Sequence, residues 1–289
     1  MFLELLSPVG SRGVHASAPP CFLPLADCPA GLMYGMAVYT TFRFPLADCW
    51  WNAHLTRLKE NAAQLGLSLP FPADVIRLAL EALIETEGCT QSVFRLTAIA
   101  DVQEYGDFYT GTENGLKPAR LLLSARKSGT SVLSSAGPLQ SPVAVKAVDA
   151  IRPLPLIKHS GMADVIRLKQ AALLSGFSEI LLAQNGILRE ASTSNIFLIQ
   201  AGQLLTPDPV RDGCLPGITR QRVLLTAKGL GIPVAETGPL LMRDLPHWDG
   251  AFLTNAAQGI RPVSRIDQHA LPWPSEAKGW IQALAESLR

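Results

Sequence analysis

The stretch Ile157-Lys158-His159-Ser160-Gly161 decides how this chain is interpreted, together with Glu190, which follows Lys158 by 32 positions. Lys158 comes after the apolar run Leu154-Pro155-Leu156-Ile157, so we expect it to emerge from an apolar, extended segment. A lysine in apolar surroundings is a candidate for a lowered pKa, and a neutral amine is a nucleophile toward carbonyl groups. A carboxylate can pair with a protonated pyridine nitrogen, so lysine and acid together are the minimum set for pyridoxal 5'-phosphate (PLP). On composition alone a structural explanation is favoured, in which Lys158 ends a strand and Glu190 lies in a turn.

Further motifs that follow in a fixed order give the PLP interpretation more weight. After Lys158 come the segments Glu190-Ala191-Ser192-Thr193-Ser194-Asn195-Ile196-Phe197, Leu215-Pro216-Gly217-Ile218-Thr219-Arg220 and Phe252-Leu253-Thr254-Asn255. With them the chain resembles the PLP enzymes of fold type IV, which include branched-chain aminotransferases, D-amino-acid aminotransferases and aminodeoxychorismate lyases. The resemblance covers most of the chain, from about Gly31 to Asp267. One such motif is weak evidence, whereas several in the right order are strong evidence. The resemblance implies a mixed α/β (α+β) fold with two domains, similar to D-amino-acid aminotransferase.

The resemblance also implies roles for individual residues. Lys158 is implied to be the catalytic residue, which holds the cofactor PLP covalently and then acts as a general base, and Glu190 to contact the pyridine nitrogen. Arg57 lies in the segment His54-Leu55-Thr56-Arg57-Leu58, where the family holds the cofactor phosphate with a planar guanidinium. The other implied cofactor contacts are Ile218, Thr219 and Thr254. The alternative explanation for Arg57 is an exposed arginine on a helix. The alternative for Gly217-Ile218-Thr219 is an ordinary helix start, because a Gly-x-Thr sequence is common there.

Substrate contacts are implied on a strand in the first half of the chain. Residues 34–44 alternate in polarity and are rich in β-forming residues, so they predict a strand, and its family counterpart lines the substrate pocket. The implied substrate-binding residues are Tyr39, Thr41 and Asn255. Family members commonly carry an arginine-glycine pair after the next strand, which helps to bind a substrate carboxylate. Here Ala100-Asp101 takes its place, and Arg95 earlier in that strand is another candidate.

Several positions favour the lyase branch of the family. Aminotransferases tend to carry glutamate after the aromatic residue of the substrate strand, whereas bacterial aminodeoxychorismate lyases often carry Thr-Thr, as this chain does at Thr40 and Thr41. Two ordinary β-branched strand residues are the structural alternative. Branched-chain aminotransferases usually have a tyrosine where this chain has Ala163, and the segment 252–263 resembles lyase sequences.

We therefore expect 4-amino-4-deoxychorismate lyase activity, which eliminates pyruvate and gives 4-aminobenzoate for folate synthesis. A branched-chain or D-amino-acid aminotransferase is the alternative function. A third possibility is a binding protein that has kept the fold without the activity, but the presence of Lys158, Glu190, Arg57 and Thr219 argues against it.

The hydrophobic pattern predicts alternating helices and strands in two domains. A polar, Gly-rich segment at 127–139 separates a smaller N-terminal α/β domain, residues 1–128, from a larger domain, residues 129–289, that carries the PLP lysine. Helices are expected at about 48–66, 74–87, 164–174, 217–229 and 275–288, the last with Ser275 as N-cap. Strands are expected at about 34–44, 92–100, 119–125, 141–147, 179–183, 187–190, 196–200, 203–206, 232–236 and 251–254. Residues 1–30 are rich in Ser, Pro, Ala and Gly and predict extended or irregular structure.

Bulk composition excludes several classes of protein. The 289 residues carry 25 basic and 24 acidic side chains without a basic block, which argues against nucleic acid as a partner. No apolar run approaches the length of a membrane span, and the start lacks the features of a signal peptide, so we expect no membrane and a cytoplasmic location. The five cysteines are scattered, which indicates neither a disulfide framework nor a metal site. The expected partner is a small-molecule substrate, and a homodimer is implied by the resemblance alone.

Overall fold

The structure is a computed structural model that describes residues 2–5, 31, 34–88, 92–101, 116–126 and 141–288. It divides into two compact units. The first comprises Met1–Gly129 together with Ile157–Gly161, and the second comprises Thr130–Leu156 together with Met162–Arg289. The predicted polar segment at 127–139 and most of the irregular start lie outside the described residues.

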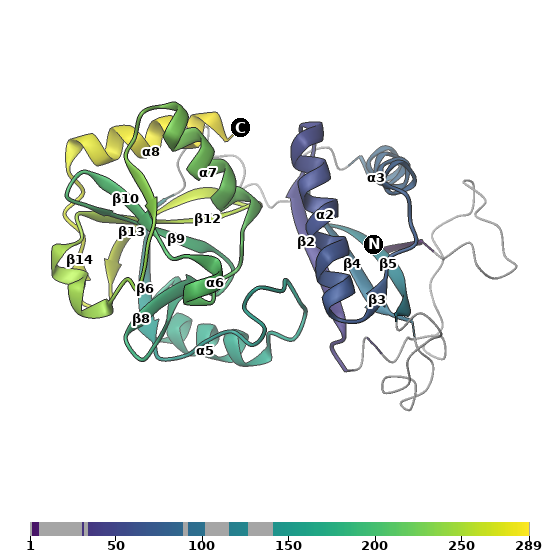
Figure 1. The fold of residues 1–289 in the computed structure, drawn as a ribbon, viewed down its shortest axis with the longest axis horizontal. Coiled ribbons are helices and arrows are strands. Elements are labelled where there is room, and N and C mark those ends of the chain that lie inside the picture. The colour runs from purple at the N-terminus through teal and green to yellow at the C-terminus, as the bar shows by residue number, and fades with distance from the viewer. Residues whose placement is uncertain are drawn as a thin grey trace, which may run out of the picture. The chain divides into compact units, whose positions relative to one another are not determined.

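The first unit is built on a sheet with the strand order β1-β5-β4-β2, in which neighbours are antiparallel, and β3 pairs with β5 in parallel. Its strands are β1 (Phe2–Leu5), β2 (Ala37–Arg43), β3 (Leu67–Ser68), β4 (Val93–Ala100) and β5 (Lys117–Arg126). Its helices are α2 (Asp48–Gln64) and α3 (Ala73–Glu87). Figure 1 shows α2 running beside β2.

Alternation along β2 decides which side chains meet α2. Val38, Thr40 and Phe42 are buried, and the apolar ones join Leu55 and Leu58 of α2 in one core cluster. Because side chains alternate along a strand, Tyr39 and Thr41 occupy the opposite face. The strand predicted from the sequence therefore presents one face to the core and leaves the other for contacts outside it.

The second unit contains a larger mixed sheet with the order β11-β10-β9-β12-β13-β6-β7-β8, and β14 pairs with β13. The pairs β6–β7, β6–β13 and β10–β11 are parallel and the others are antiparallel. Its strands are β6 (Val143–Val148), β7 (Glu179–Gln184), β8 (Ile187–Ala191), β9 (Asn195–Gln200), β10 (Gln203–Thr206), β11 (Val234–Glu236), β12 (Gly250–Asn255), β13 (Gly259–Ile266) and β14 (His269–Ala270). Its helices are α5 (Ala163–Leu174), α6 (Pro209–Asp212), α7 (Ile218–Gly229), α8 (Ser275–Ser287) and the 3₁₀ helix η3 (Met242–His247).

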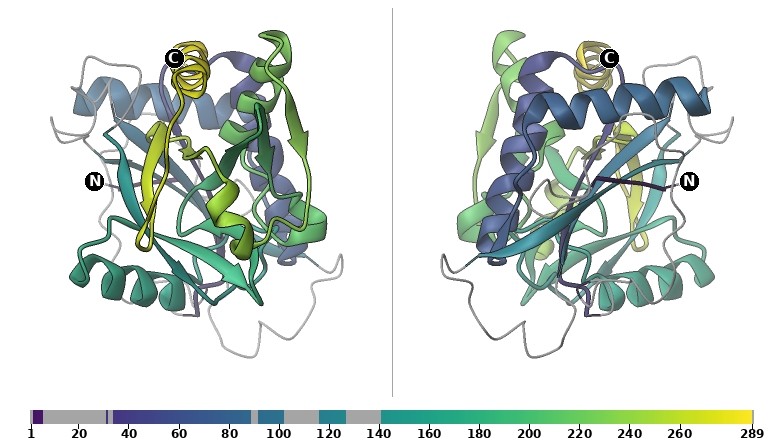
Figure 2. Two further views of the ribbon diagram at one scale, coloured as in Figure 1. Left: turned by 90° about the vertical axis from the view of Figure 1, so that its left-hand side faces the viewer. Right: turned by 90° about the vertical axis from the view of Figure 1, so that its right-hand side faces the viewer.

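Helices cover the strands of the second unit from two sides. Phe197 of β9 and Phe252 of β12 stack with ring centroids 5.0 Å apart, and they share a core cluster with Val223 of α7 and Ile281 of α8. The left-hand view of Figure 2 shows α8 and α5 on opposite sides of the strands. The central strands are therefore buried on both faces, which explains their nearly continuous apolar sequences.

Two hairpins in this unit join neighbouring strands that the sequence predicts. Asn185 and Gly186 join β7 to β8 with φ values of 53° and 75°, and Ala201 and Gly202 join β9 to β10 with φ values of 48° and 73°. Both pairs adopt the left-handed conformation that tight hairpin turns require, which glycine and asparagine tolerate best. The second hairpin places β9 beside β10 and brings Asn195 to the start of a central strand.

The mixed α/β fold class is confirmed, while some local predictions were wrong. Ser275 is the first residue of α8 and not its N-cap, which is Pro274, because proline's fixed φ suits a helix start. The strands β3, β13 and β14 were not predicted, and β1 lies in a segment that was predicted only as extended or irregular. The segment before Lys158 is a run of bends and turns instead of an extended strand, and Leu154 in it has a φ of 45°.

The segment 157–161 belongs to the first unit because it is bonded to β2. Tyr39 N donates to Lys158 O and Ser160 N donates to Ala37 O, each at 2.9 Å, around a bridge between Val38 and His159. The division into residues 1–128 and a domain at 129–289 that carries this lysine stays a prediction. Among the described residues, no helix is long and apolar enough to cross a membrane.

Candidate active site

Lys158 is held by main-chain and side-chain bonds in the first unit. Its carbonyl accepts from Tyr39 N, and its own N–H donates to Asn61 Oδ1 of α2 at 2.9 Å. The amine Nζ lies 4.6 Å from the centroid of the Tyr39 ring. The irregular backbone before it follows from Pro153 and Pro155, which have no N–H to donate to a strand partner. Lys158 is thus fixed at a defined point beside β2, with its amine over an aromatic ring.

Arg57 lies on the face of α2 that meets β2. Its NH2 donates to Thr40 Oγ1 at 3.0 Å, and Thr40 Oγ1 lies 2.7 Å from His54 Nδ1. The Nε atom of Arg57 is buried and has no hydrogen-bond partner among the described residues. Burial lowers the pKa of the Arg57 guanidinium to about 10, while the coulombic effect of Tyr39 acts in the opposite direction. A buried cation with an unused donor is suited to an anionic ligand.

The other face of β2 carries the predicted substrate residues Tyr39 and Thr41. Arg95 of β4 is paired with Thr41 across the sheet, and its Cζ lies 3.6 Å from the centroid of the Tyr39 ring. Arg95 also donates to Thr97 Oγ1 at 3.1 Å and to Ser160 Oγ at 3.2 Å. Burial lowers the pKa of Arg95, with Tyr39 acting in the opposite direction. The structure therefore gathers a cation, a phenol and hydroxyl groups around the segment that carries Lys158.

Glu190 of β8 is a buried carboxylate in the second unit. Its Oε1 accepts from Arg152 Nε at 2.9 Å and its Oε2 accepts from Leu215 N at 3.0 Å. The Glu190 and Arg152 side chains are 5% and 6% exposed. Arg152 donates as well to Pro155 O. A guanidinium and a main-chain amide therefore fix both oxygens of the Glu190 carboxylate in the second unit.

The start of α7 and the end of β12 lie side by side in the second unit. Ile218 and Thr219 are the buried first residues of α7, and no side chain caps the helix at Gly217. Thr254 of β12 is paired with Asn195 of β9, and its buried Oγ1 has no hydrogen-bond partner among the described residues. Gly217 contacts Asn195 so closely that a Cβ atom at Gly217 would lie 2.0 Å from Asn195 Oδ1. The amides at a helix start suit a phosphate group, and the Thr254 hydroxyl is a further donor of the kind that a phosphate accepts.

Asn255 has a local structural task in addition to its predicted substrate contact. Its Oδ1 accepts from Ala257 N at 3.0 Å and from Gln258 N at 2.8 Å, so it stabilises the turn between β12 and β13. Its Nδ2 donates to Ser194 Oγ at 2.9 Å. The side chain therefore joins the turn to the segment that follows Glu190.

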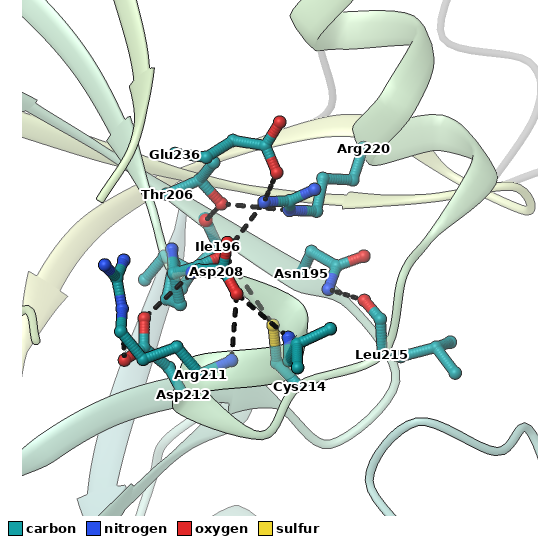
Figure 3. Close-up of polar contacts among 12 residues, drawn as sticks. Asn195, Ile196, Thr206, Asp208, Arg211, Asp212, Cys214, Leu215, Arg220 and Glu236 are labelled. Carbon is teal, nitrogen blue, oxygen red and sulfur yellow. Dashed lines mark hydrogen bonds and ion pairs between the residues drawn. The ribbon is translucent and has the colours of Figure 1, made fainter. Parts of the chain in front are cut away.

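A polar network holds the loop that supplies the Leu215 amide to Glu190. Figure 3 shows Arg220 of α7 directed at Glu236 and Thr206, and Arg220 NH2 donates to Glu236 Oε2 and to Pro207 O, each at 2.8 Å. Asn195 Nδ2 donates to Leu215 O at 2.7 Å. The helix that begins at the candidate phosphate site thus also fixes the loop that touches Glu190.

Cys214 lies in this loop and is buried. Its burial, and to a lesser extent Glu190, raises the pKa of its thiol to about 12. The thiol is therefore protonated near neutral pH and is a poor nucleophile.

A model of the family described as "Amino-transferase class IV" matches residues 37–266. The chain belongs to the class IV aminotransferase family. Enzymes of this family bind PLP, and this class IV protein is a PLP-dependent enzyme. Its two curled sheets with flanking helices agree with the fold that the resemblance implied.

Relatives of this class IV protein are named as aminotransferases. A "Probable branched-chain-amino-acid aminotransferase" of Thermotoga maritima is 36% identical over 126 residues, which cover 44% of this chain and 45% of the relative. A "Putative branched-chain-amino-acid aminotransferase" of Methanocaldococcus jannaschii is 29% identical over 82% of this chain and 81% of the relative. The crystal structure of a "Putative 4-amino-4-deoxychorismate lyase" from Legionella pneumophila superposes with a TM-score of 0.75 at 21% identity, covering 95% of this chain and 97% of that chain. This last likeness shows the fold.

The residues present in this class IV chain fit PLP. The first unit offers an amine at Lys158 and a buried guanidinium at Arg57 with an unused donor. The second unit offers a buried carboxylate at Glu190 and the start of α7 near Thr254; in the part of the chain that the structure describes, no side chain caps this helix and the Thr254 hydroxyl has no hydrogen-bond partner. An amine, an acid and phosphate donors are the groups that an aldehyde, a pyridine nitrogen and a phosphate need.

Sequence reasoning missed two residues that touch the predicted site. Arg152 pairs with Glu190, and Asn61 binds the amide of Lys158. Each left a weak signal: Arg152 is a charge between the apolar runs around Ile151 and Pro153, and Asn61 stands one helical turn after Arg57. Neither signal identifies a partner, because the partners are distant in the sequence.

Replacing Gly217 with alanine is expected to lower the affinity for PLP by about tenfold or more, because a new Cβ would force Asn195 away and release Leu215 from it. Gly229→Ala at the other end of α7 is the matched control, since a Cβ there meets no atom within 4 Å. The measurement is a PLP titration followed by absorbance. Equal affinities of the two variants would contradict the assignment of this helix start to the phosphate.

Proposed function

We propose that this class IV enzyme is a 4-amino-4-deoxychorismate lyase, which eliminates pyruvate from its substrate and releases 4-aminobenzoate for folate synthesis. The observation that carries the proposal is the pair Thr40-Thr41 on β2, where aminotransferases of the family tend to carry glutamate. Thr40 is fully buried and bonded to Arg57 and His54, so its hydroxyl helps to fix the guanidinium that is assigned to the phosphate. Thr41 lies on the opposite face with Tyr39 and Arg95, available to a substrate.

In this proposal each site residue has one task. PLP, when bound, supplies a ring that accepts the electron pair left when a proton leaves the carbon next to the substrate nitrogen. Lys158 binds the cofactor aldehyde and, once released, takes that proton on its Nζ. Glu190 keeps the pyridine nitrogen protonated, and the ion pair with Arg152 holds the Glu190 carboxylate in place. The phosphate is held by Arg57, Ile218, Thr219 and Thr254.

Substrate recognition is assigned to the face of β2 that carries Tyr39 and Thr41, and to Asn255. The proton leaves the ring carbon, the C–O bond to the enolpyruvyl group breaks, the ring becomes aromatic, and pyruvate forms after protonation of the leaving group. The Thr41 hydroxyl is placed to relay that proton. Arg95, which lies on Tyr39, is the cation available for a substrate carboxylate in place of the arginine-glycine pair that this chain lacks at Ala100-Asp101. A cytoplasmic homodimer is part of the same proposal.

A branched-chain aminotransferase is the second candidate function. The names of the relatives favour it, since the one from Methanocaldococcus jannaschii is similar over most of both chains. Lys158, Glu190 and Arg57 would keep the same tasks in that reaction. The two functions differ in the acceptor, because a transaminase needs a 2-oxo acid to receive the amino group, whereas the lyase needs none.

A direct assay separates the two candidates. The purified protein is mixed with PLP and aminodeoxychorismate, which its synthase generates in place, and 4-aminobenzoate and pyruvate are measured. A parallel assay offers leucine, isoleucine or valine with 2-oxoglutarate. Equal amounts of 4-aminobenzoate and pyruvate are the expected result. Glutamate formation in the second assay, without 4-aminobenzoate in the first, would overturn the lyase in favour of the aminotransferase.

A further inference from the structure

The main-chain amide of Lys158 has a side-chain partner where a strand would offer a backbone one. In a regular antiparallel pair, Tyr39 and Lys158 would exchange two backbone bonds. Tyr39 N supplies one of them to Lys158 O, but Lys158 N donates to Asn61 Oδ1 at 2.9 Å. The irregular segment 151–157 offers no strand that could position Lys158 from its N-terminal side. Asn61 therefore acts on the lysine's backbone from a separate element, helix α2.

Asn61 is placed rigidly enough for this task. Asn61 is 4% exposed. It lies on the same buried face of α2 as Arg57, which precedes it by four positions. Residues four apart on a helix are neighbours about 6 Å apart on one face. One helical turn thus carries both the guanidinium assigned to the phosphate and the contact that fixes the lysine's amide.

We propose that Asn61 is a positioning residue, which sets the backbone of Lys158 at a fixed spacing from Arg57 so that the amine meets the aldehyde of a phosphate-anchored PLP. The proposal rests on the cofactor roles assigned above to Lys158 and Arg57. It gives α2 the task of a spacer between two contacts with one cofactor. A displacement of about 1 Å in a reacting group can cost about a hundredfold in rate, so a single bond to the lysine's amide has a measurable effect.

Variants of Asn61 can separate the loss of its acceptor oxygen from a change in side-chain shape. The oxygen must face Lys158, because only the oxygen can accept from an N–H. Asn61→Leu keeps the approximate shape and removes the acceptor, whereas Asn61→Asp keeps an acceptor oxygen. Asn52→Leu makes the same chemical change on an exposed position of the same helix and is the matched control.

The test measures three properties of each variant. Hydrogen exchange of the Lys158 amide in cofactor-free protein reports the bond itself. The rate of PLP attachment to Lys158 is followed by absorbance, and the product is fixed by borohydride and located by mass spectrometry. Binding of pyridoxamine 5'-phosphate, which has the phosphate and ring but no aldehyde, reports the remaining contacts.

For Asn61→Leu we expect the Lys158 amide to exchange about tenfold faster and PLP to attach to Lys158 about tenfold more slowly. The affinity for pyridoxamine 5'-phosphate should stay within about twofold of that of the unmodified protein. Asn61→Asp is expected to restore most of the attachment rate, and Asn52→Leu to equal the unmodified protein. If Asn61→Leu does not fold, Asn61→Ala makes the same comparison with a smaller side chain.

Two results would overturn the role of Asn61. One is an unchanged attachment rate and unchanged exchange in Asn61→Leu. The other is a parallel loss of attachment and of pyridoxamine phosphate binding, which would indicate that Asn61 only supports the fold of α2. A lack of attachment at Lys158 in the unmodified protein would refute the cofactor role of Lys158 and, with it, the positioning role that depends on it. In that case, equal exchange rates of the Lys158 amide in the unmodified protein and in Asn61→Leu would also refute the hydrogen bond between this amide and Asn61.

Discussion

Lys158→Ala is expected to lower turnover by about a thousandfold or more with either candidate substrate. The substitution removes the amine that binds the cofactor aldehyde and the base that takes the substrate proton, and a positioned base alone contributes about 10² to 10⁴ in rate. The measurement is product formation under single-turnover conditions, with 4-aminobenzoate for the lyase and glutamate for the aminotransferase.

A surface lysine provides the control for this variant. Lys146 of β6 pairs with Asp267 at 2.8 Å and its side chain is 44% exposed, so Lys146→Ala removes a positive charge without touching an assigned site residue. Its activity should remain within about twofold of the unmodified protein, because exposed ion pairs contribute little. Equal activities of Lys158→Ala and Lys146→Ala would remove Lys158 from the chemistry.

Glu190→Gln is expected to have the second largest effect, a loss of about a hundredfold in turnover together with a loss of stability. Without the carboxylate charge, the pyridine nitrogen no longer has an anionic partner, so the ring withdraws electrons less strongly. The change also leaves the buried Arg152 guanidinium without its counter-charge, which costs about 3 kcal/mol in the free energy of unfolding. Turnover and a denaturant titration measure the two effects separately.

A double variant distinguishes the catalytic effect from the structural one. Replacing a whole buried ion pair with uncharged residues is often neutral for stability, whereas removing one partner is costly. Glu190→Gln combined with Arg152→Met should therefore recover most of the lost stability while turnover stays low. If turnover recovered along with stability, Glu190 would be a structural residue and its assignment to the pyridine nitrogen would be refuted.

The local structure of this chain could be predicted where neighbouring residues decide it. The strands on either side of Asn185-Gly186 were predicted from their apolar runs, and both turn residues adopt the positive φ that such a hairpin needs. The helix Ala163–Leu174 was predicted at 164–174 from its periodic apolar residues. The extended segment before Lys158 was predicted wrongly, because its apolar composition suggested a strand while two prolines and the positive φ of Leu154 impose bends.

The candidate site was predicted through its motifs and not through its contacts. Lys158, Glu190 and Arg57 stand in segments that resemble the family, so they could be named without a structure. Asn61 and Arg152 could not, since the first binds a residue 97 positions away and the second a residue 38 positions away. Such contacts depend on how strands and helices pack, which spacing along the chain does not encode. The same limit applies to Asn255, whose bonds within its own turn are visible only in the structure.

The central claim is that Lys158 carries PLP. The most direct measurement incubates the purified protein with PLP, reduces it with borohydride, digests it, and locates the added phosphopyridoxyl mass on the peptides. We predict one modified site at Lys158, at close to one cofactor per chain, and no stable modification of Lys146 or Lys169, which pair with acids in the second unit. Modification spread over surface lysines, or none at Lys158, would contradict the account.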